Sequence, residues 1–317
     1  MGTATSAKDF NSVRTIEVGP ERDGQRVDNC LAALLKGVPR SLLYRLLRTG
    51  QVRINGKRAK PDTRLATGDR LRIPPVSTVS PRNTELPPGA MLEAVQQAVI
   101  FEDRDFLVID KPSGIASHGG SGVAFGAVEL LRAARPNERL ELAHRLDRDT
   151  SGVLVLARTR AGLTGLQAAI RDGTTKKQYL CLMTGNLAQA KFDVNAPLRK
   201  SVLAGGERMV RVDDAGKPAL TFFREIERYR GASLVEATLA TGRTHQIRVH
   251  AAHAGYPLAG DPKYGEREAN KHFRAFGLKR MFLHAARFEF EIGERAWSYS
   301  APLPDDLRGV LDCLHNR

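Results

Sequence analysis

The sequence predicts an α+β protein with a small basic N-terminal domain and a larger C-terminal domain. Residues 25–75 combine two helical patterns with short strand patterns, and a stretch rich in proline and polar residues follows up to residue 89. Beyond residue 96, apolar runs of strand length alternate with helical patterns. With 317 residues the chain is long enough for two domains. We therefore expect a disordered tail at 1–14, a first domain at 15–76, a linker at 77–95 and a second domain at 96–317.

The composition indicates a folded protein that binds a polyanion. Hydrophobic residues make up 42% of the chain, which supplies a core and excludes general disorder. Lysine and arginine number 49 against 35 acidic residues, and the formal net charge is +14. This excess favours nucleic acid as the partner, although charge alone does not separate RNA from DNA or from an anionic membrane.

Cysteine usage and the lack of a long apolar segment predict a soluble, cytoplasmic protein. Cys30, Cys181 and Cys313 lie far apart and lack the spacing of metal ligands, so we expect reduced thiols. The first ten residues have no apolar segment of the kind found in signal peptides. No apolar run approaches the roughly 18–20 residues that a membrane span needs.

The first domain is predicted to contain two short helices and a hairpin. Apolar residues recur with helical spacing over residues 27–35, and Ser41 is placed to cap a second helix over residues 42–48. Asn55-Gly56 is typical of a tight turn between two strands. Gly68-Asp69 forms another turn, which leads into a strand at 70–73.

Basic residues dominate this first domain. Between residues 36 and 72 the only acidic residues are Asp62 and Asp69, against eleven lysines and arginines. Such an imbalance on two helices and a hairpin predicts a surface that clamps an RNA backbone, whereas the alternative is an ordinary solvated surface. The candidate RNA-binding residues are Arg40, Arg45, Arg48, Arg53, Lys57 and Arg58.

Strand and helix patterns alternate in the second domain. Strands are expected at 98–101, 106–110, 176–183 and 233–239, and helices at 128–132 and 163–170. Residues 114–122 are rich in glycine and contain His118, which predicts a mobile loop rather than a phosphate cradle. Residues 244–254 are predicted to form a helix that Thr244 caps, with His245 and Arg248 on one face.

The stretch at 143–157 places charged residues directly before a buried strand. Residues 153–157 are uninterrupted aliphatic residues, while the six residues before Thr150 hold three basic side chains and two carboxylates. We expect at least one carboxylate here to be paired with an arginine or desolvated, which makes it a candidate nucleophile or acid/base group. The alternative is a loop with a structural Arg–Asp pair. An aspartic protease is disfavoured because no second such loop supplies a carboxylate dyad.

Residues 144–152, His-Arg-Leu-Asp-Arg-Asp-Thr-Ser-Gly, resemble the signature of the RNA pseudouridine synthases of the large-subunit ribosomal RNA type. Three further motifs of that family follow in its order: Lys177-x-Tyr179, residues 241–250 as Thr-Gly-Arg-Thr-His-Gln-Ile-Arg-Val-His, and residues 260–265 as Gly-Asp-Pro-Lys-Tyr-Gly. The first domain resembles the S4 RNA-binding module, and the combination is similar to the C/D branch of the family. The resemblance implies an S4-like module and a catalytic domain with a mixed, mostly antiparallel sheet.

The resemblance also implies roles for eight residues of the second domain. Asp147 corresponds to the essential carboxylate, Arg248 to the arginine that keeps it ionised, and Tyr179 to the ring that lies against the target base. Arg145 would fill the gap that the flipped base leaves, and Leu283 would form an apolar side of the base pocket. Further substrate contacts are expected from Lys177, Arg243 and His245.

Converting uridine to pseudouridine breaks the N1–C1′ bond, turns the base and joins C5 to C1′. No electron or phosphate is transferred, so the resemblance implies no cofactor and no metal, with RNA as the partner of a monomer. The carboxylate can act as a nucleophile or as the base that yields a glycal, and the sequence does not distinguish these routes.

Two other functions are compatible with parts of the sequence. A non-catalytic RNA-binding assembly factor would keep the basic first domain but would not need the intact motif around Asp147. A metallohydrolase could use the four histidines at 245, 250, 253 and 284, but their spacing lacks the His-Glu-x-x-His pattern.

Overall fold

A computed structural model of the chain describes residues 12–35, 38–76, 87–120, 123–202 and 208–316, without the side chains of Arg40, Ser41, Val202 and Arg208. These residues form two units that divide between Leu86 and Pro87. The expected tail therefore lies largely outside the described residues. Within them, no helix is long and apolar enough to cross a membrane.

The first unit packs two helices on a small antiparallel sheet. Helices α1 (Val27–Leu34) and α2 (Arg40–Arg48) follow a 3-10 turn, η1 (Pro20–Arg22). The sheet has the order β1 (Arg14–Glu17), β4 (Arg70–Ile73), β2 (Arg53–Ile54), β3 (Lys57–Arg58). Leucine and valine side chains of both helices and of β4 form one buried core.

Two local expectations for this unit had different outcomes. The Asn55-Gly56 turn is confirmed, because both residues have positive φ, 50° and 80°, as the tight turn between β2 and β3 requires. Ser41 is not the cap of the second helix. That helix begins two residues earlier than expected, at Arg40, and Pro39, with φ −57° and ψ 136°, takes the N-cap position.

The second unit is built on a ten-stranded mixed sheet. Its main path has the order β10-β13-β14-β9-β15-β8-β6-β5, while β16 pairs with β15 and β7 pairs with β8. All of these pairs are antiparallel except β8 with β15. The strands are β5 (Val99–Glu102), β6 (Phe106–Lys111), β7 (Glu141–Leu142), β8 (Ser151–Ala157), β9 (Lys176–Thr184), β10 (Lys191–Asn195), β13 (Leu220–Tyr229), β14 (Ala232–Leu239), β15 (Leu283–Ile292) and β16 (Arg295–Ser300). The α+β class and the mixed, mostly antiparallel sheet are confirmed.

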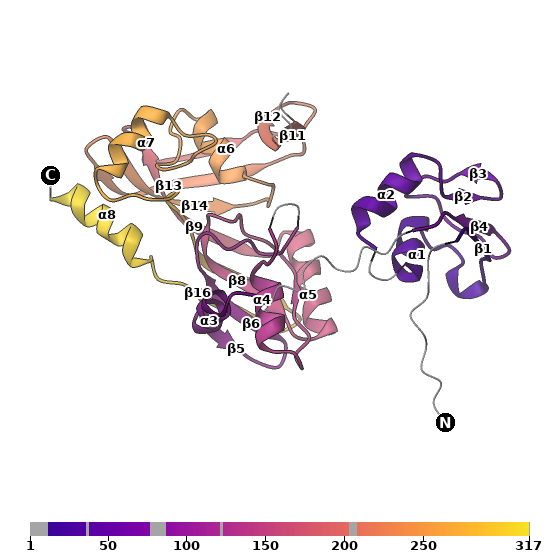
Figure 1. Ribbon diagram of the computed structural model, residues 1–317. Coiled ribbons are helices and arrows are strands. Elements are labelled where there is room, and N and C mark those ends of the chain that lie inside the picture. Colours follow the sequence, from indigo (N-terminus) through magenta and orange to yellow (C-terminus); the bar gives the residue numbers. More distant parts are fainter. Residues whose placement is uncertain (1–11, 36–37, 77–86, 121–122, 203–207, 317) are drawn as a thin grey trace. The chain divides into compact units, whose positions relative to one another are not determined.

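Helices cover both faces of this sheet. Helices α3 (Gly89–Gln97) and α4 (Ala127–Ala134) pack on β6 and β8, and α5 (Arg160–Asp172) packs on the opposite face of the same strands (Figure 1). Helix α6 (Gln246–His253) packs on β9, β13 and β14. Helices α7 (Arg267–Arg274) and α8 (Asp305–His315) pack on the opposite face of β9 and β14. The side chain of Tyr179 contacts both the α4 and the α6 clusters, so it marks the middle of one face.

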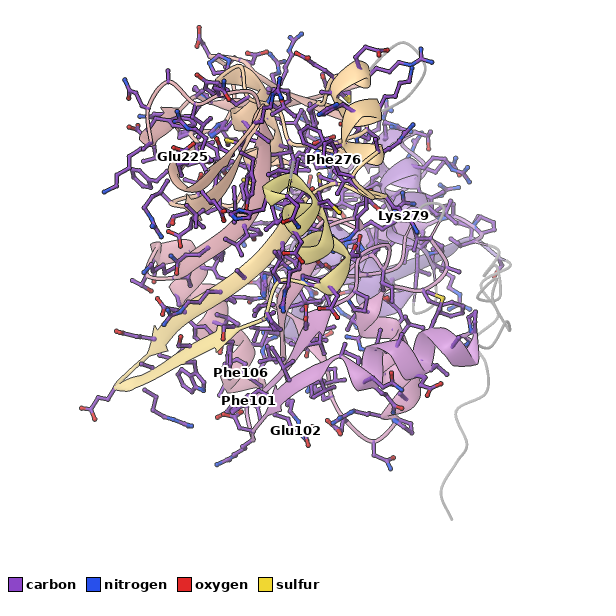
Figure 2. All side chains as sticks on the ribbon, turned by 90° about the vertical axis from the view of Figure 1, so that its left-hand side faces the viewer. Phe101, Glu102, Phe106, Glu225, Phe276 and Lys279 are labelled. Atoms are coloured by element: carbon purple, nitrogen blue, oxygen red, sulfur yellow. The ribbon has the colours of Figure 1, made fainter. Side chains whose placement is uncertain are left out.

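Two short elements complete this unit. Strands β11 (Leu198–Val202) and β12 (Arg208–Val212) form a separate hairpin that packs against α6. Phe101 of β5 and Phe106 of β6, both labelled in Figure 2, pack on the rings of Tyr299 and Phe290 in the β15–β16 hairpin.

Residues 89–95, which the sequence analysis assigns to the linker, are helical in the structure. They form most of α3, whose alanine, methionine, leucine and glutamate residues favour a helix. Val95 is fully buried against the α4 cluster. Tertiary burial of one apolar face therefore makes this segment part of the second unit.

Candidate active site

A cleft of about 920 Å³ opens on the face of the sheet that carries α4 and α6. Its walls are the loop before β8, the cleft-facing side of β9, and the turn that leads into α6. The eight catalytic and substrate-binding candidates of the second domain all line it: Arg145, Asp147, Lys177, Tyr179, Arg243, His245, Arg248 and Leu283. Segments that are distant in the sequence are thus brought together where β8, β9 and β15 meet.

The loop that carries Asp147 is fixed by backbone hydrogen bonds on both sides of that residue. The hydroxyl of Ser117 accepts a hydrogen bond from Leu146 N and donates one to Leu146 O, both at 2.8 Å. The buried ammonium of Lys111 donates to Arg148 O at 3.2 Å and to two carbonyls of its own loop. Burial lowers the pKa of Lys111 to about 7, while Asp149 and Asp147 oppose this effect. Asp147 is therefore held rigidly although it lies in a loop.

Arg248 bridges two carboxylates. Its Nε and one terminal nitrogen donate to Asp261 at 2.7 and 2.8 Å, and the other terminal nitrogen donates to Asp147 Oδ2 at 3.3 Å. The Arg248 side chain is 6% exposed and that of Asp147 is 29% exposed. Burial lowers the pKa of Arg248, but the hydrogen bond and charge of Asp261, with the charge of Asp147, hold it above its usual value. The guanidinium therefore presents a fixed positive charge to Asp147.

Asp261 supports Arg248 from behind, and the sequence analysis did not assign it a role. Its side chain is fully buried, and Oδ1 also accepts backbone hydrogen bonds from Lys263 and Tyr264. Burial raises the pKa of Asp261, but the contacts with Arg248 and these two N–H groups outweigh it, so the pKa is lowered. The signal was present in the Gly-Asp-Pro-Lys-Tyr-Gly motif, but its partner lies thirteen residues away on α6.

The turn into α6 differs from the expectation that Thr244 caps the helix. The N-cap residue is His245, which has a left-handed backbone with φ 54°. The side-chain amide of Gln246 accepts hydrogen bonds from Thr241 Oγ1 and Arg243 N, and it donates to Leu220 O. Because Gln246 closes the turn from inside the helix, Thr244 is not needed as a cap. The expected proximity of His245 and Arg248 is observed, because both approach the same oxygen: His245 Nε2 and a terminal nitrogen of Arg248 lie 3.8 and 3.3 Å from Asp147 Oδ2.

The opposite wall of the cleft is formed by β9 and β15. Tyr179 pairs with Ala237 of β14 and Ala285 of β15, and Leu283 is 4% exposed. Burial, with a smaller effect from Asp147, raises the pKa of Tyr179, so its hydroxyl stays protonated. Lys177 lies over the Phe288 ring at 5.3 Å, and burial lowers its pKa to about 8. The wall thus offers a ring and an aliphatic side chain, with one cation beside them.

Two arginines lie near the rim. Arg145 Nη1 is 3.0 Å from His118 Nε2, and within the described chain Arg145 forms no ion pair with Asp147 or Asp149. The exposed Arg243 donates from Nε to Pro218 O. A planar group that enters the cleft would therefore meet a carboxylate with its arginine, an imidazole, a tyrosine ring and two rim arginines.

The basic candidates of the first unit lie on its surface. Arg45, Arg48, Arg53, Lys57 and Arg58 are exposed. Arg58 donates to Arg48 O at 2.7 Å, which joins α2 to β3. Arg40 begins α2, but its side chain lies outside the described part. In the described residues there is no group of three or more His, Cys, Asp or Glu side chains that could hold a metal ion.

Comparison with known proteins identifies the family. The family profile for RNA pseudouridylate synthases matches residues 105–253, and the S4 domain profile matches residues 25–71. The "Ribosomal large subunit pseudouridine synthase C" of Salmonella typhimurium is 46% identical over 312 residues, which cover 96% of this chain and 98% of that protein. The chain belongs to the RNA pseudouridine synthase family. As a member, it is an isomerase of the large-subunit type that acts on RNA.

Other pseudouridine synthases agree with this assignment. The protein of the same name from Escherichia coli K12 is 46% identical, covering 96% of this chain and 98% of that protein. The one from Haemophilus influenzae is 45% identical and covers 96% of both chains. The solved structure "Human RNA Pseudouridylate Synthase Domain Containing 4" aligns with a TM-score of 0.59 at 23% identity. It covers 71% of this chain and 96% of that one, and it shows the shared fold.

Proposed function

We propose that this pseudouridine synthase modifies specific uridines of 23S ribosomal RNA, with Asp147 as the catalytic carboxylate. The observation that carries the proposal is the contact between Asp147 and the buried Arg248 in the cleft, at 3.3 Å. The large-subunit names of relatives that match 96% of the chain support the choice of RNA. We expect the enzyme to act as a monomer in the cytoplasm, where ribosomal RNA is made.

Asp147 has one of two roles in the first step. It attacks C1′ and forms a covalent sugar ester, or it removes the C2′ proton and yields a glycal. In either route the N1–C1′ bond breaks and its electron pair stays on the base. The base then turns and C5 bonds to C1′. In the first route this breaks the ester bond and releases Asp147, and in the second Asp147 returns the proton to C2′. The C5 proton then leaves. Arg248 keeps Asp147 ionised and oriented, and the buried Asp261 keeps Arg248 in place.

The cleft is suited to a base taken out of its stack. Tyr179 and Leu283 would hold the two faces of the uracil ring, since both line the wall next to Asp147. Extracting the base costs about a few kcal/mol, and the planar guanidinium of Arg145 would offset part of this by filling the gap in the stack. Lys177, Arg243 and His245 would contact the backbone or the base.

The S4 domain would hold RNA outside the reacting nucleotide. Its exposed cations can neutralise phosphates and so provide affinity without base specificity. The candidates are Arg40, Arg45, Arg48, Arg53, Lys57 and Arg58.

The assignment of Asp147 is tested by comparing two isosteric variants two residues apart. Asp147→Asn should abolish tritium release from large-subunit RNA that carries 5-tritiated uridine, because the amide is neither a nucleophile nor a base. Asp149→Asn is the matched control: Asp149 is half-buried and paired with Arg148, so its variant should lose less than about tenfold in rate. Normal release by Asp147→Asn together with a dead Asp149→Asn enzyme would overturn the assignment. RNA binding by both variants should be unchanged, which separates chemistry from affinity.

A further inference from the structure

Tyr264 lies between the β11–β12 hairpin and α6, beside the active site. Its ring packs with the cluster formed by Leu198, Val210 and Val249. The Arg248 guanidinium lies over the same ring, 5.0 Å from its centre. Its hydroxyl accepts a hydrogen bond from Val210 N at 3.0 Å. Tyr264 is therefore fixed from three sides, and its Oη cannot move without breaking a backbone hydrogen bond.

The hydrogen bonds of Tyr264 determine which nitrogen of His245 carries a proton. Tyr264 Oη lies 2.8 Å from His245 Nδ1. Among the hydrogen bonds of the described residues, His245 Nδ1 is the one acceptor within reach of the Tyr264 O–H, so the hydroxyl that accepts from Val210 N–H donates its own proton to Nδ1. The imidazole proton therefore resides on Nε2. That nitrogen lies 3.8 Å from Asp147 Oδ2, too far for a hydrogen bond, so its N–H is available to a group that enters between them.

The surroundings favour a neutral imidazole. Burial lowers the pKa of His245, and the positive charges of Arg248 and Lys263 act in the same direction, against Asp147 and Asp261. The left-handed backbone at His245, φ 54°, is a conformation that non-glycine residues seldom adopt. Such conformations are retained where the surrounding structure holds them, commonly at functional sites. Here the strained backbone directs the ring toward the carboxylate.

We propose that His245 donates a hydrogen bond from Nε2 to a carbonyl oxygen of the target uracil, and that Tyr264 is the positioning residue that fixes this donor. The proposal rests on the proposed function of Asp147. When the N1–C1′ bond breaks, the electron pair of that bond remains on N1 and spreads over the O2 and O4 carbonyls. A neutral N–H donor beside Asp147 stabilises this developing anion more than the neutral base, so it lowers the barrier. A neutral donor also avoids placing a second cation against the carboxylate that Arg248 already pairs.

A chemical double-mutant cycle tests the contact between His245 and the base. The substrates are a synthetic RNA with the mapped target uridine, and the same RNA with 2-thiouridine or 4-thiouridine there. The variant is His245→Asn, because asparagine tolerates the left-handed backbone and its short side chain does not reach as far as the imidazole. For the wild-type enzyme we expect one of the two sulfur substitutions to slow a single turnover at least about tenfold, since sulfur is the weaker acceptor. The His245→Asn variant should turn over the unmodified RNA about 100-fold more slowly than the wild type. In this variant the same sulfur substitution should slow the reaction little further, because the hydrogen bond is already absent.

The role of Tyr264 is tested with two Tyr→Phe variants, each of which removes a hydroxyl that accepts a hydrogen bond from a backbone N–H. Tyr264→Phe should lower the single-turnover rate by about tenfold or more with little change in KM, because the imidazole tautomer is no longer fixed. Tyr256 is the matched control: its hydroxyl also accepts a backbone N–H, from Ala188 at 3.1 Å, but it lies outside the cleft. Tyr256→Phe should change the rate less than about twofold.

Two results would overturn the inference. One is additive losses for His245→Asn with both thio substrates, and the other is equal effects of Tyr264→Phe and Tyr256→Phe. Neither result would affect the assignment of Asp147. Failure of the wild-type enzyme to form pseudouridine in the unmodified RNA would instead refute the proposed function itself.

Discussion

Arg248 is the residue in which stability and chemistry are most closely joined. Three of its nitrogens are directed at two carboxylates, and one of these, Asp261, is fully buried. Arg248→Ala would leave that buried charge without its partner, at a cost of about 3–5 kcal/mol in stability. Loss of activity in an alanine variant would then be ambiguous, because it could reflect misfolding.

Arg248→Lys is the sharper test, because it keeps the positive charge. A lysine presents one point charge and cannot span Asp261 and Asp147 together, so Asp147 should lose its orientation. We expect the single-turnover rate to fall by about 100-fold while the protein stays folded. The matched control is Arg228→Lys, which breaks a bidentate pair with Glu225 outside the cleft. Equal activity of the two lysine variants would show that the fork geometry of Arg248 is not needed.

Among the elements, strand β8 sets the position of the catalytic loop through its parallel pairing with β15. Gly152 makes this close approach possible. Its φ is 112°, and a Cβ atom there would lie 2.2 Å from the backbone oxygen of Ala285. The neighbouring backbone cannot rotate away as a flexible side chain could, so any larger residue must separate the two strands.

Gly152→Ala should therefore lower the free energy of unfolding by about 4 kcal/mol, within the range of severe core substitutions. Gly173→Ala is the control, since Gly173 also has positive φ, 76°, but has open space where a Cβ would lie. It should cost only about 1–2 kcal/mol, from the left-handed backbone alone. Urea unfolding followed by fluorescence of Trp297, the single tryptophan and part of β16, reports on this unit. Equal urea midpoints for the two variants would show that a Cβ at residue 152 does not clash with the Ala285 backbone.

Elements with strong local signals were predictable from the sequence. The aliphatic run at 153–157 is buried throughout in β8, and the Asn55-Gly56 turn has the backbone angles that the turn requires. Elements that depend on tertiary contacts were not. The N-terminus of α6 is closed by the Gln246 amide rather than by Thr244, and α3 is helical because Val95 is buried against α4.

The same distinction applies to the site. The motifs predicted which side chains line the cleft, because each motif carries its residues as a set. They did not reveal that Ser117 fixes the backbone beside Asp147, or that Tyr264 determines the proton on His245. These contacts join segments 19–29 residues apart, and neither residue has a local pattern that indicates its partner.

For the molecule as a whole, the positive charge can act on RNA in two ways: some cations contact phosphates directly, and the others attract the RNA from a distance. The chain carries a formal charge of +14, and many of its arginines are exposed in both units. Exposed cations in general raise the rate of encounter with RNA, whereas only those that contact phosphates release counterions on binding. The salt dependence of affinity separates the two contributions.

We expect the S4 cations to belong to the phosphate-contacting class. Replacing Arg45, Arg48 and Arg53 by glutamine in the full chain should reduce the slope of log affinity against log salt by about 2 to 3 in magnitude, since each phosphate contact contributes roughly 0.7–0.9. The control removes the same charge from three exposed arginines of the second unit that do not line the cleft, Arg139, Arg160 and Arg308. The slope of this control should stay close to that of the wild type, because these three arginines contact no phosphate and their loss weakens only the general attraction. Titration of a large-subunit RNA fragment between 50 mM and 200 mM salt gives both slopes. Equal slopes for the two triple variants would mean that the S4 domain contributes net charge only, and that the RNA is held by the catalytic domain.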